Sequence, residues 1–355
     1  MDDGHIGRWR RPPKLFLQGR TTRRRDMILC ADIGATKTLL GLAEVHPETG
    51  RVVVKASQRY VAAQVPSFEA MLTDFLSQHG PSLSQPLRAV GLGVAGPVRD
   101  QTVQMTNLPW RLDARELSRH LGGVPVTLVN DFEAAAHGIE ALAPDELMTL
   151  QAGDAQARGN QLVLGAGSGL GVAFRIWQGN GHAVVPGEGG HFSFSPINDQ
   201  QDLALQRLRP LVPRVVVEHF VSGPGLANFY QCLGDEPPTK VITPMDTEGL
   251  TGESVFRKAT KEGDALAAQA LEQFLLAYGS VAGDYALATL ARGGVYVAGG
   301  VAQRCGEMMR DGRFMRGFGQ KGPYTELMAT LPVHLVLQPE LGLVGAAVAG
   351  ARLPH

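Results

Sequence analysis

The sequence predicts an α/β protein with two lobes and a cleft between them. Short, continuous apolar runs, which are typical of buried strands, alternate with longer amphipathic segments. A strand, a glycine turn and a second strand at residues 27–45 recur in the same order at 161–177. A chain of 355 residues is also long for one hydrophobic core, so two domains are expected. A cleft between two such lobes is a usual place for a ligand.

The domain boundaries follow from these patterns. Residues 1–26 are rich in arginine, and their apolar LFL is too short for a signal-peptide core. We expect a disordered basic extension there, with a targeting segment or a tail for an anionic partner as the alternative. A small α/β domain should occupy 27–140 and a large α/β domain 141–340. A C-terminal helix at about 341–355 should pack back on the small domain.

In the first half, the hairpin at 27–45 is followed by a third strand in RVVVKASQRYVA, residues 51–62. SFEAMLTDFLSQH, residues 67–79, has a serine cap and apolar residues at helical spacing. It predicts an amphipathic helix. RAVGLGVAGPV at 88–98 and VTLVND at 126–131 predict strands of a sheet that is covered on both faces.

The second half repeats this organisation from the hairpin at 161–177 onward. Residues 264–290 form one long helical pattern. GGVYVAGGVAQR, residues 293–304, predicts a strand, a Gly-Gly turn and the start of a helix. The segment 332–353 predicts a final strand and a helix of small residues.

Charge and cysteine content exclude several classes of function. The net charge is -1, whereas nucleic-acid and membrane-surface partners favour a basic excess, so we expect neither. No apolar run reaches the roughly 18 residues that span a bilayer. Cys30, Cys232 and Cys305 are odd in number and far apart, which fits neither a disulfide framework nor a cysteine-rich zinc site. A reduced, cytoplasmic setting is expected.

Two glycine loops, ADIGATKT at 31–38 and LGAGSGLG at 164–171, carry the main chemical signal. Glycine lets backbone N–H groups approach an anion closely, as in phosphate-binding sites. Neither loop matches G-x-x-x-x-G-K-[ST], and Leu170 stands where G-x-G-x-x-G requires its third glycine. One such loop would be an ordinary hairpin turn, but two together favour phosphate binding.

Two further features belong with these loops. Asp32, at the end of a strand, could hold Mg²⁺ through water. The VAGG turn at 297–300 ends a strand where an adenosine could lie on exposed backbone. The candidate nucleotide-binding residues are Asp32, Gly34, Ala35, Thr36, Lys37, Gly167, Ser168, Gly169, Gly299 and Gly300.

With GVAGPV at 93–98 and Asn130-Asp131, these loops resemble the actin-like (ribonuclease H-like) sugar-kinase ATPase superfamily. PGEGGH at 186–191 and VEHFVSGPGLANFY at 217–230 look like the bacterial glucokinase family. The resemblance covers 27–355 and implies ATP with Mg²⁺ as cofactor, glucose as substrate and, as is common in the family, a homodimer. The related repressor–kinase–ORF branch carries a cysteine-rich zinc motif after the sugar-binding histidine. FSFSPIND follows that histidine here, so we expect the chain to lie outside that branch.

A hexose presents hydroxyl groups and no charge, so its site should offer carboxylates, amides and imidazole. Taken alone, Glu188 and His191 would be a solvated loop pair, Glu218 an exposed helix position and Asn107 a turn residue. The resemblance instead implies a set of sugar-binding residues. They are Asn107, Asn130, Asp131, Glu188, His191 and Glu218.

Asp131 is the expected general base. Phosphoryl transfer needs positioning, charge neutralisation and a base for the attacking hydroxyl, and a carboxylate at the end of a buried strand is rigidly held. The alternative is a helix N-cap, worth roughly 1 kcal/mol. The resemblance favours the base and implies direct in-line transfer from ATP to the 6-hydroxyl of glucose, without a phosphoenzyme.

Three alternatives stay open from the sequence. The acceptor could be a related hexose, either mannose or an N-acetylhexosamine. The donor could be ADP or polyphosphate. A sugar-sensing regulator on the same fold is a third interpretation, since fold alone does not determine function. Such a regulator should carry a DNA-binding module, for which the first 26 residues are too short, or lack Asp131.

Overall fold

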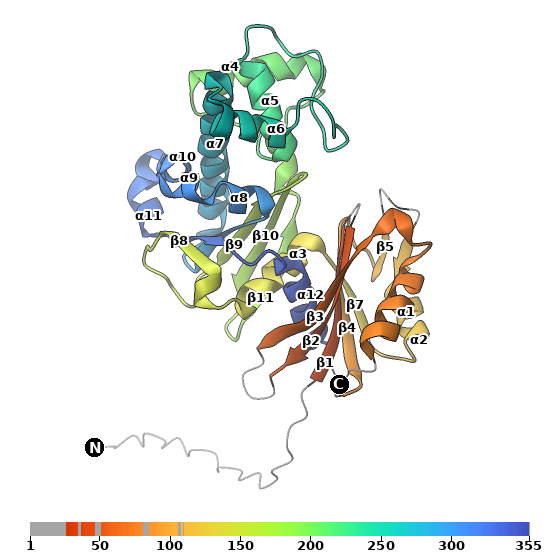
Figure 1. Cartoon of the computed structure of the whole chain (residues 1–355). Helices are drawn as coiled ribbons and strands as arrows, with labels where there is room; N and C mark the ends of the chain where they lie inside the picture. The colour runs from red at the N-terminus through yellow and green to blue at the C-terminus, as the bar shows by residue number, and fades with distance from the viewer. Residues whose placement is uncertain are drawn as a thin grey trace, which may run out of the picture.

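The computed structural model describes residues 26–34, 37–46, 51–80, 85–105, 108 and 110–354. The predicted extension therefore lies almost wholly outside the described residues, as do the candidate residues Ala35, Thr36 and Asn107. The rest of the chain forms two lobes, each built on its own β-sheet (Figure 1). The predicted α/β class is confirmed.

The first sheet has five strands in the order β3-β2-β1-β4-β7. Strands β1, β2 and β3 form an antiparallel meander, and β4 and β7 run parallel to β1. The hairpin and the third strand predicted from the sequence are thus confirmed, as are the two buried strands. The strand bounds are β1 Asp26–Ile33, β2 Lys37–Val45, β3 Val52–Val61, β4 Leu87–Val94 and β7 Val126–Asn130.

Helices cover both faces of this sheet. On one face, α1 (Phe68–His79) buries Phe68 and Phe75, and the Ser67 hydroxyl accepts a hydrogen bond from the Ala70 N–H at 3.2 Å, which confirms the predicted cap. On the other face lies the helix of small residues, α12 (Leu341–Ala351). A Cβ on Gly91 of β4 would be 1.9 Å from the Ala346 carbonyl oxygen. The small residues therefore serve close packing of α12 on the sheet.

The second sheet has six strands in the order β11-β10-β9-β12-β13-β8. Strands β9 and β10 form the second predicted glycine hairpin, and β12 and β13 run parallel to β9. The bounds are β8 Leu147–Gln151, β9 Gln161–Ala166, β10 Leu170–Trp177, β11 His182–Gly187, β12 Gly294–Ala298 and β13 Val333–Val336.

The long helix α7 (Ala265–Thr289) packs on one face of the second sheet, as part of the largest apolar cluster of the molecule's described residues. The other face receives α3 (Asp131–Gly138) through Ala135 and Ala136. Helices α3 and α12 thus lie between the two sheets (Figure 1). Since α3 contacts both sheets, a domain boundary near residue 140 stays a prediction.

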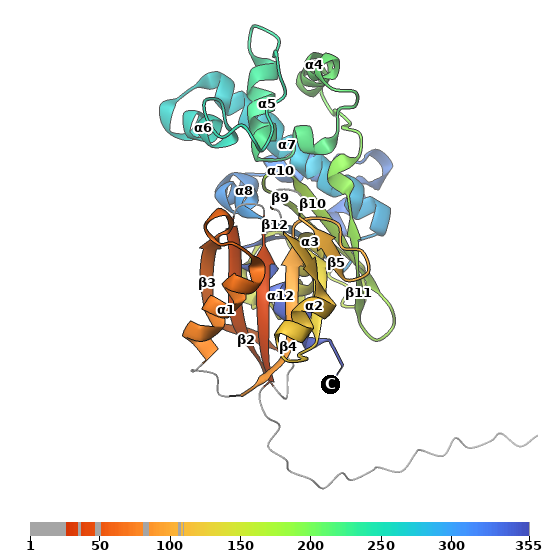
Figure 2. The same cartoon turned by 90° about the vertical axis from the view of Figure 1, so that its right-hand side faces the viewer.

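Shorter elements complete the two lobes, and α4, α5 and α6 stand with α7 at the end of the molecule remote from the first sheet (Figure 2). They are η1 Ala62–Gln64, β5 Thr102–Gln104, β6 Arg111–Asp113, α2 Ala114–His120, η3 Ile139–Ala141, η4 Pro144–Glu146, η5 Gly189–His191, α4 Asp199–Leu208, η6 Arg209–Leu211, η7 Val217–His219, α5 Gly223–Leu233, α6 Gly252–Arg257, η8 Lys258–Glu262, α8 Gly300–Arg304, α9 Gly306–Arg310, α10 Arg313–Gly319, η9 Gly322–Tyr324 and α11 Thr325–Thr330. In the described ranges, no helix is both long and apolar enough to cross a membrane. Cys30, Cys232 and Cys305 are buried and unpaired.

Candidate active site

The junction between β7 and α3 carries the candidate base. Asn130 is the N-cap of α3, and its side-chain oxygen accepts hydrogen bonds from the N–H groups of Phe132 at 2.9 Å and Glu133 at 3.4 Å. The Glu133 carboxylate accepts from the Asn130 N–H at 3.4 Å, which completes a capping box. The alternative in which Asp131 caps the helix is therefore wrong. Asp131 is the first helical residue, and its side chain is not needed as the cap.

The electrostatic environment of Asp131 shifts the pKa of its carboxyl upward. Burial raises the pKa of this carboxyl, and the negative charge of Glu188 adds to that effect. The hydrogen bond that Asp131 accepts from the Phe132 N–H, at 2.9 Å, acts in the opposite direction. Glu188 follows β11 of the second sheet, so residues from both lobes share one electrostatic environment at this point.

Asp32 is the last residue but one of β1, and its carboxyl interacts electrostatically with Asp131. Burial raises the pKa of Asp32 to about 6, with further contributions from the charges of Asp131 and Glu340. A Cβ on Gly342, in the first turn of α12, would be 2.8 Å from an Asp32 carboxylate oxygen, so this carboxylate lies against the start of that helix. Glu340 was not predicted. The only local signal for it is an acidic residue directly before the last helix, where a carboxylate is common in any helix.

These carboxylates lack a compensating cation in the described part of the chain, since no ion pair there involves Asp32, Asp131 or Glu340. Within the same residues, no group of three or more His, Cys, Asp or Glu side chains could hold a metal ion. The arrangement fits a hard cation held by one carboxylate through water, with further ligands from a substrate, as Mg²⁺ is commonly held.

Different neighbouring groups explain why glycine stands at each position of the second loop. A Cβ on Gly171 would lie 1.8 Å from the Phe132 ring, and one on Gly165 would lie 2.9 Å from it. A Cβ on Gly169 would lie 2.3 Å from the Glu218 carboxylate. Only open space surrounds the Cβ position of Gly167. Most of the glycine pattern therefore serves contacts within the protein, and Gly167 is left facing free volume.

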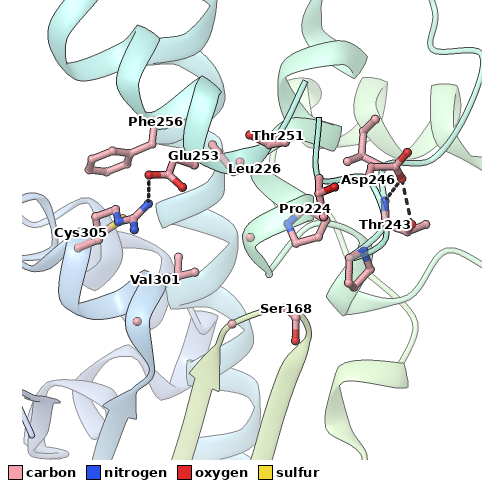
Figure 3. Close-up of a pocket in the computed structure, with 18 residues that line it drawn as sticks. Ser168, Pro224, Leu226, Thr243, Asp246, Thr251, Glu253, Phe256, Val301 and Cys305 are labelled. Carbon is pink, nitrogen blue, oxygen red and sulfur yellow. Dashed lines mark hydrogen bonds and ion pairs between the residues drawn. The ribbon is translucent and has the colours of Figure 1, made fainter. Parts of the chain in front are cut away.

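That free volume is a cavity of about 510 Å³ beside the second glycine loop (Figure 3). Gly167 and Ser168 line one side of it and Gly300 lines another, and their nucleotide-binding role stays a prediction. Gly299 sits at the β12–α8 turn with φ +90, and its own Cβ would meet the Ala166 carbonyl oxygen at 2.8 Å. The pattern of the sequence gave no signal for the remaining walls, which come from α5, α6 and the segment 242–247 and include Leu226, Ile242, Thr243, Asp246 and Phe256.

The first glycine loop is a tight turn between β1 and β2. The Gly34 N–H donates to the Lys37 carbonyl oxygen at 3.0 Å, and Lys37 is exposed. Because Ala35 and Thr36 are outside the described residues, their predicted role is not addressed by the geometry.

The candidate sugar residues of the second lobe lie on two neighbouring segments. Glu188 and His191 are exposed at the turn η5 after β11. Glu218, in η7, is half-buried and not an exposed helix position, and its carboxylate accepts from the Leu170 N–H at 2.9 Å. The same carboxylate lies 3.4 Å from the Cβ position of Gly190. Glu218 therefore connects the glycine loop before β10 to the loop that carries Glu188 and His191.

Imidazole groups complete this side of the site. Burial lowers the pKa of His219, while the charge of Glu218 opposes that effect and that of His191 adds to it. These three residues are thus close enough to interact electrostatically. The structure brings together Asn130, Asp131, Glu188, His191 and Glu218 from both lobes, and Asn107 lies outside the described residues.

Comparison with known proteins agrees with this arrangement. The family model described as Glucokinase matches residues 29–353. A glucokinase of Trichormus variabilis is 36% identical over 343 residues, which cover 92% of this chain and 99% of that protein. The crystal structure of a glucokinase from an Antarctic psychrotroph is 30% identical, with a TM-score of 0.81, covering 92% of this chain and 99% of that one.

A ROK family glucokinase from Streptomyces griseus is more distant, at 21% identity and a TM-score of 0.58, with 92% of this chain and 100% of that chain covered. At this identity the likeness concerns the fold alone. The two lobes described above are those of the actin-like ATPase fold of sugar kinases. The chain belongs to the glucokinase family and is a sugar kinase.

Proposed function

We propose that this chain transfers the γ-phosphoryl group of ATP to the 6-hydroxyl of D-glucose, giving glucose 6-phosphate and ADP. The observation that carries the proposal is the environment of Asp131. Its carboxylate stands at the end of a buried strand, is not needed as a helix cap, and interacts with Glu188 of the opposite lobe. The Streptomyces griseus structure, which has the same fold, contains glucose and AMPPNP, an ATP analogue, and this supports ATP as donor.

The nucleotide would lie in the second lobe, with its base and ribose in the cavity beside Gly167 and Gly300. A volume of about 510 Å³ is within the usual range for a small-molecule site. The Gly167 N–H already donates to the Gly169 carbonyl oxygen at 2.8 Å, so the phosphates would extend past the backbone of Ser168 toward the Gly34–Lys37 turn of the first lobe. Asp32 would hold Mg²⁺ through water, and the ion would supply positive charge that neutralises the phosphates.

The sugar would lie between Asp131 and the two segments of the second lobe that carry Glu188, His191 and Glu218. Each of these groups can accept or donate a hydrogen bond to a hydroxyl, which suits a ligand without charge. Glu218 is held by the Leu170 N–H, so its free carboxylate positions are oriented before substrate binds. Asn130 uses its amide oxygen for the helix cap and one amide N–H for the Gly96 carbonyl oxygen at 3.2 Å, so it fixes the junction and would donate its second N–H to the sugar.

In the reaction, Asp131 would accept the proton of the 6-hydroxyl as the sugar oxygen attacks the γ-phosphorus. The new O–P bond forms while the bond to the ADP oxygen breaks, and the proton stays on the Asp131 carboxylate until the product leaves. A base whose pKa is raised toward neutral pH is a better proton acceptor than an ordinary aspartate. Closure of the lobes would exclude water, which otherwise competes as acceptor.

The test is a coupled assay of the purified chain with a panel of acceptors and donors. We expect turnover with ATP and glucose to exceed that with mannose, fructose or N-acetylglucosamine, and to exceed that with ADP or polyphosphate. A higher kcat/KM for mannose or an N-acetylhexosamine would identify that sugar as the substrate in place of glucose, and the proposed mechanism would still apply. Binding of ATP without turnover on any sugar would contradict the enzyme and support a sugar-sensing regulator.

The family resemblance further leads us to propose a homodimer. Light scattering on the purified chain tests this proposal. A mass near 38 kDa, the mass of one chain, would overturn it.

A further inference from the structure

Helix α7 carries two tyrosines, Tyr278 and Tyr285, whose hydroxyl groups contact backbone atoms of two different loops. A spacing of seven residues is close to two helical turns, so both side chains lie on the same face of the helix. Both rings are buried, at 0% and 5% exposure. Neither residue has a role in the reaction as described above.

Tyr285 holds the loop that carries Glu188 and His191. Its hydroxyl donates a hydrogen bond to the Gly189 carbonyl oxygen at 2.5 Å, between those two residues in sequence. A Cβ on Gly189 would be 3.0 Å from the tyrosine ring, so the ring lies directly against the loop backbone. The ring of Phe192, directly after His191, packs edge-on against Tyr285 with centroids 5.7 Å apart. Both ends of the loop thus rest on one side chain.

Tyr278 holds the other loop. Its hydroxyl oxygen accepts a hydrogen bond from the Ala166 N–H at 3.0 Å, one residue before Gly167. The ring is fixed by Phe274 and Phe314, whose centroids lie 5.9 Å and 5.5 Å from its own. Because Ala166 is fully buried, its N–H has no access to water if this partner is removed.

We infer that Tyr285 and Tyr278 are positioning residues, the first for the sugar loop and the second for the nucleotide loop. A single rigid helix would then set the distance between the two loops, and hence between acceptor and donor. The substrate named for each loop rests on the proposed function. The inference that each tyrosine positions one loop does not depend on the proposed function.

The substitutions Tyr285→Phe and Tyr278→Phe test the inference, because each removes one hydroxyl and keeps the ring. We expect Tyr285→Phe to raise KM for glucose about five-fold and to leave KM for ATP within two-fold. The effect of Tyr278→Phe should be the reverse, a rise of about five-fold in KM for ATP alone. Each variant therefore serves as the control of the other, and calorimetric binding of glucose and of ATP should give the same division.

Hydrogen exchange on the ligand-free variants gives a readout that needs no substrate. Tyr285→Phe should accelerate exchange in peptides covering 188–192 and spare those covering 166–169, and Tyr278→Phe should do the opposite. The inference would be overturned if either variant accelerated exchange equally in both loops, or raised KM for glucose and KM for ATP equally. The tyrosines would then act only as general core residues. Failure of the wild-type chain to bind glucose would instead contradict the proposed function, while the exchange pattern would still decide on the two tyrosines.

Discussion

Replacing Asp32 by Asn should stabilise the ligand-free protein and impair the reaction. Burial and the charges of Asp131 and Glu340 raise the pKa of Asp32 from its ordinary value of 3.8 to about 6. A shift of about two pKa units corresponds to roughly 3 kcal/mol of unfavourable free energy for the charged form at neutral pH. Asp32 is only partly buried and lies at the N-terminal turn of α12, which offsets some of this cost. We therefore expect a gain of about 1 to 3 kcal/mol at pH 7.5.

The pH dependence of this gain has a definite sign. Because the native state binds the Asp32 proton more tightly than the unfolded chain, this residue's contribution lowers the stability of the wild type as pH rises from about 4 to about 6. The penalty is complete above that window and absent below it. The advantage of Asp32→Asn over the wild type should accordingly be near zero at pH 4 and full at pH 7.5.

Urea unfolding at several pH values, followed by fluorescence, measures the difference between variant and wild type. Asp145→Asn, which removes an exposed carboxyl from η4, directly before β8 of the second sheet, is the control and should shift stability little at any pH. Turnover with MgATP should fall in Asp32→Asn because the carboxylate proposed to hold Mg²⁺ is lost. An equal gain at pH 4 and pH 7.5, or no gain at all, would refute the electrostatic reasoning.

Three further substitutions test other parts of the structure. Burial and nearby Arg352 lower the pKa of His137 to about 4. This residue's contribution should therefore reduce stability as pH falls from about 6.5 to about 4, by up to about 3 kcal/mol. His137→Gln should flatten this part of the pH–stability curve in urea unfolding. Gly171→Ala would force a Cβ into the ring of Phe132, so it should cost about 1 to 3 kcal/mol in urea unfolding and lower kcat by displacing the neighbouring base. Gly167→Ala meets only open space, so it should keep the wild-type stability and raise KM for ATP; a stability loss equal to that of Gly171→Ala would contradict the distinction.

The elements with strong local signals could be predicted from the sequence. The two glycine hairpins, the helix after Ser67 and the long α7 each follow from turn residues, a cap or apolar periodicity within a short window. The final helix of small residues was also predictable, although the reason for its composition became clear only when Gly91 and Ala346 were found in close contact.

The chemistry of the site could be predicted only in part, because its decisive contacts join distant parts of the chain. Asn-Asp stands at a helix start twice, at Asn130-Asp131 and at Asn198-Asp199, and both asparagines are N-caps. Local sequence cannot separate these two pairs, whereas the structure buries Asp131 partly beside Glu188 and leaves Asp199 exposed. What the sequence could offer in addition was the resemblance to a family.

The same limit applies to the glycines and to the missed acid. Gly165 and Gly171 belong to the glycine pattern at 164–171, yet a Cβ on Gly171 would meet the Phe132 ring, and one on Gly165 would meet the Ala298 carbonyl oxygen and the same ring. Glu340 acts on Asp32 from more than three hundred residues away in the chain, and no local pattern reports that proximity. The roles of these glycines and of Glu340 depend on tertiary packing, which the periodicity of the sequence does not report.

The central claim is that Asp131 accepts the proton of the sugar hydroxyl, and the measurement that tests it most directly compares Asp131→Asn with Asp199→Asn. Both variants change the first residue of an asparagine-capped helix by the same atoms. We expect kcat of Asp131→Asn to fall by a factor of about 100 to 10,000 while the Kd for glucose changes little, and Asp199→Asn to match the wild type. A kcat for Asp131→Asn within a few-fold of the wild type would contradict the account.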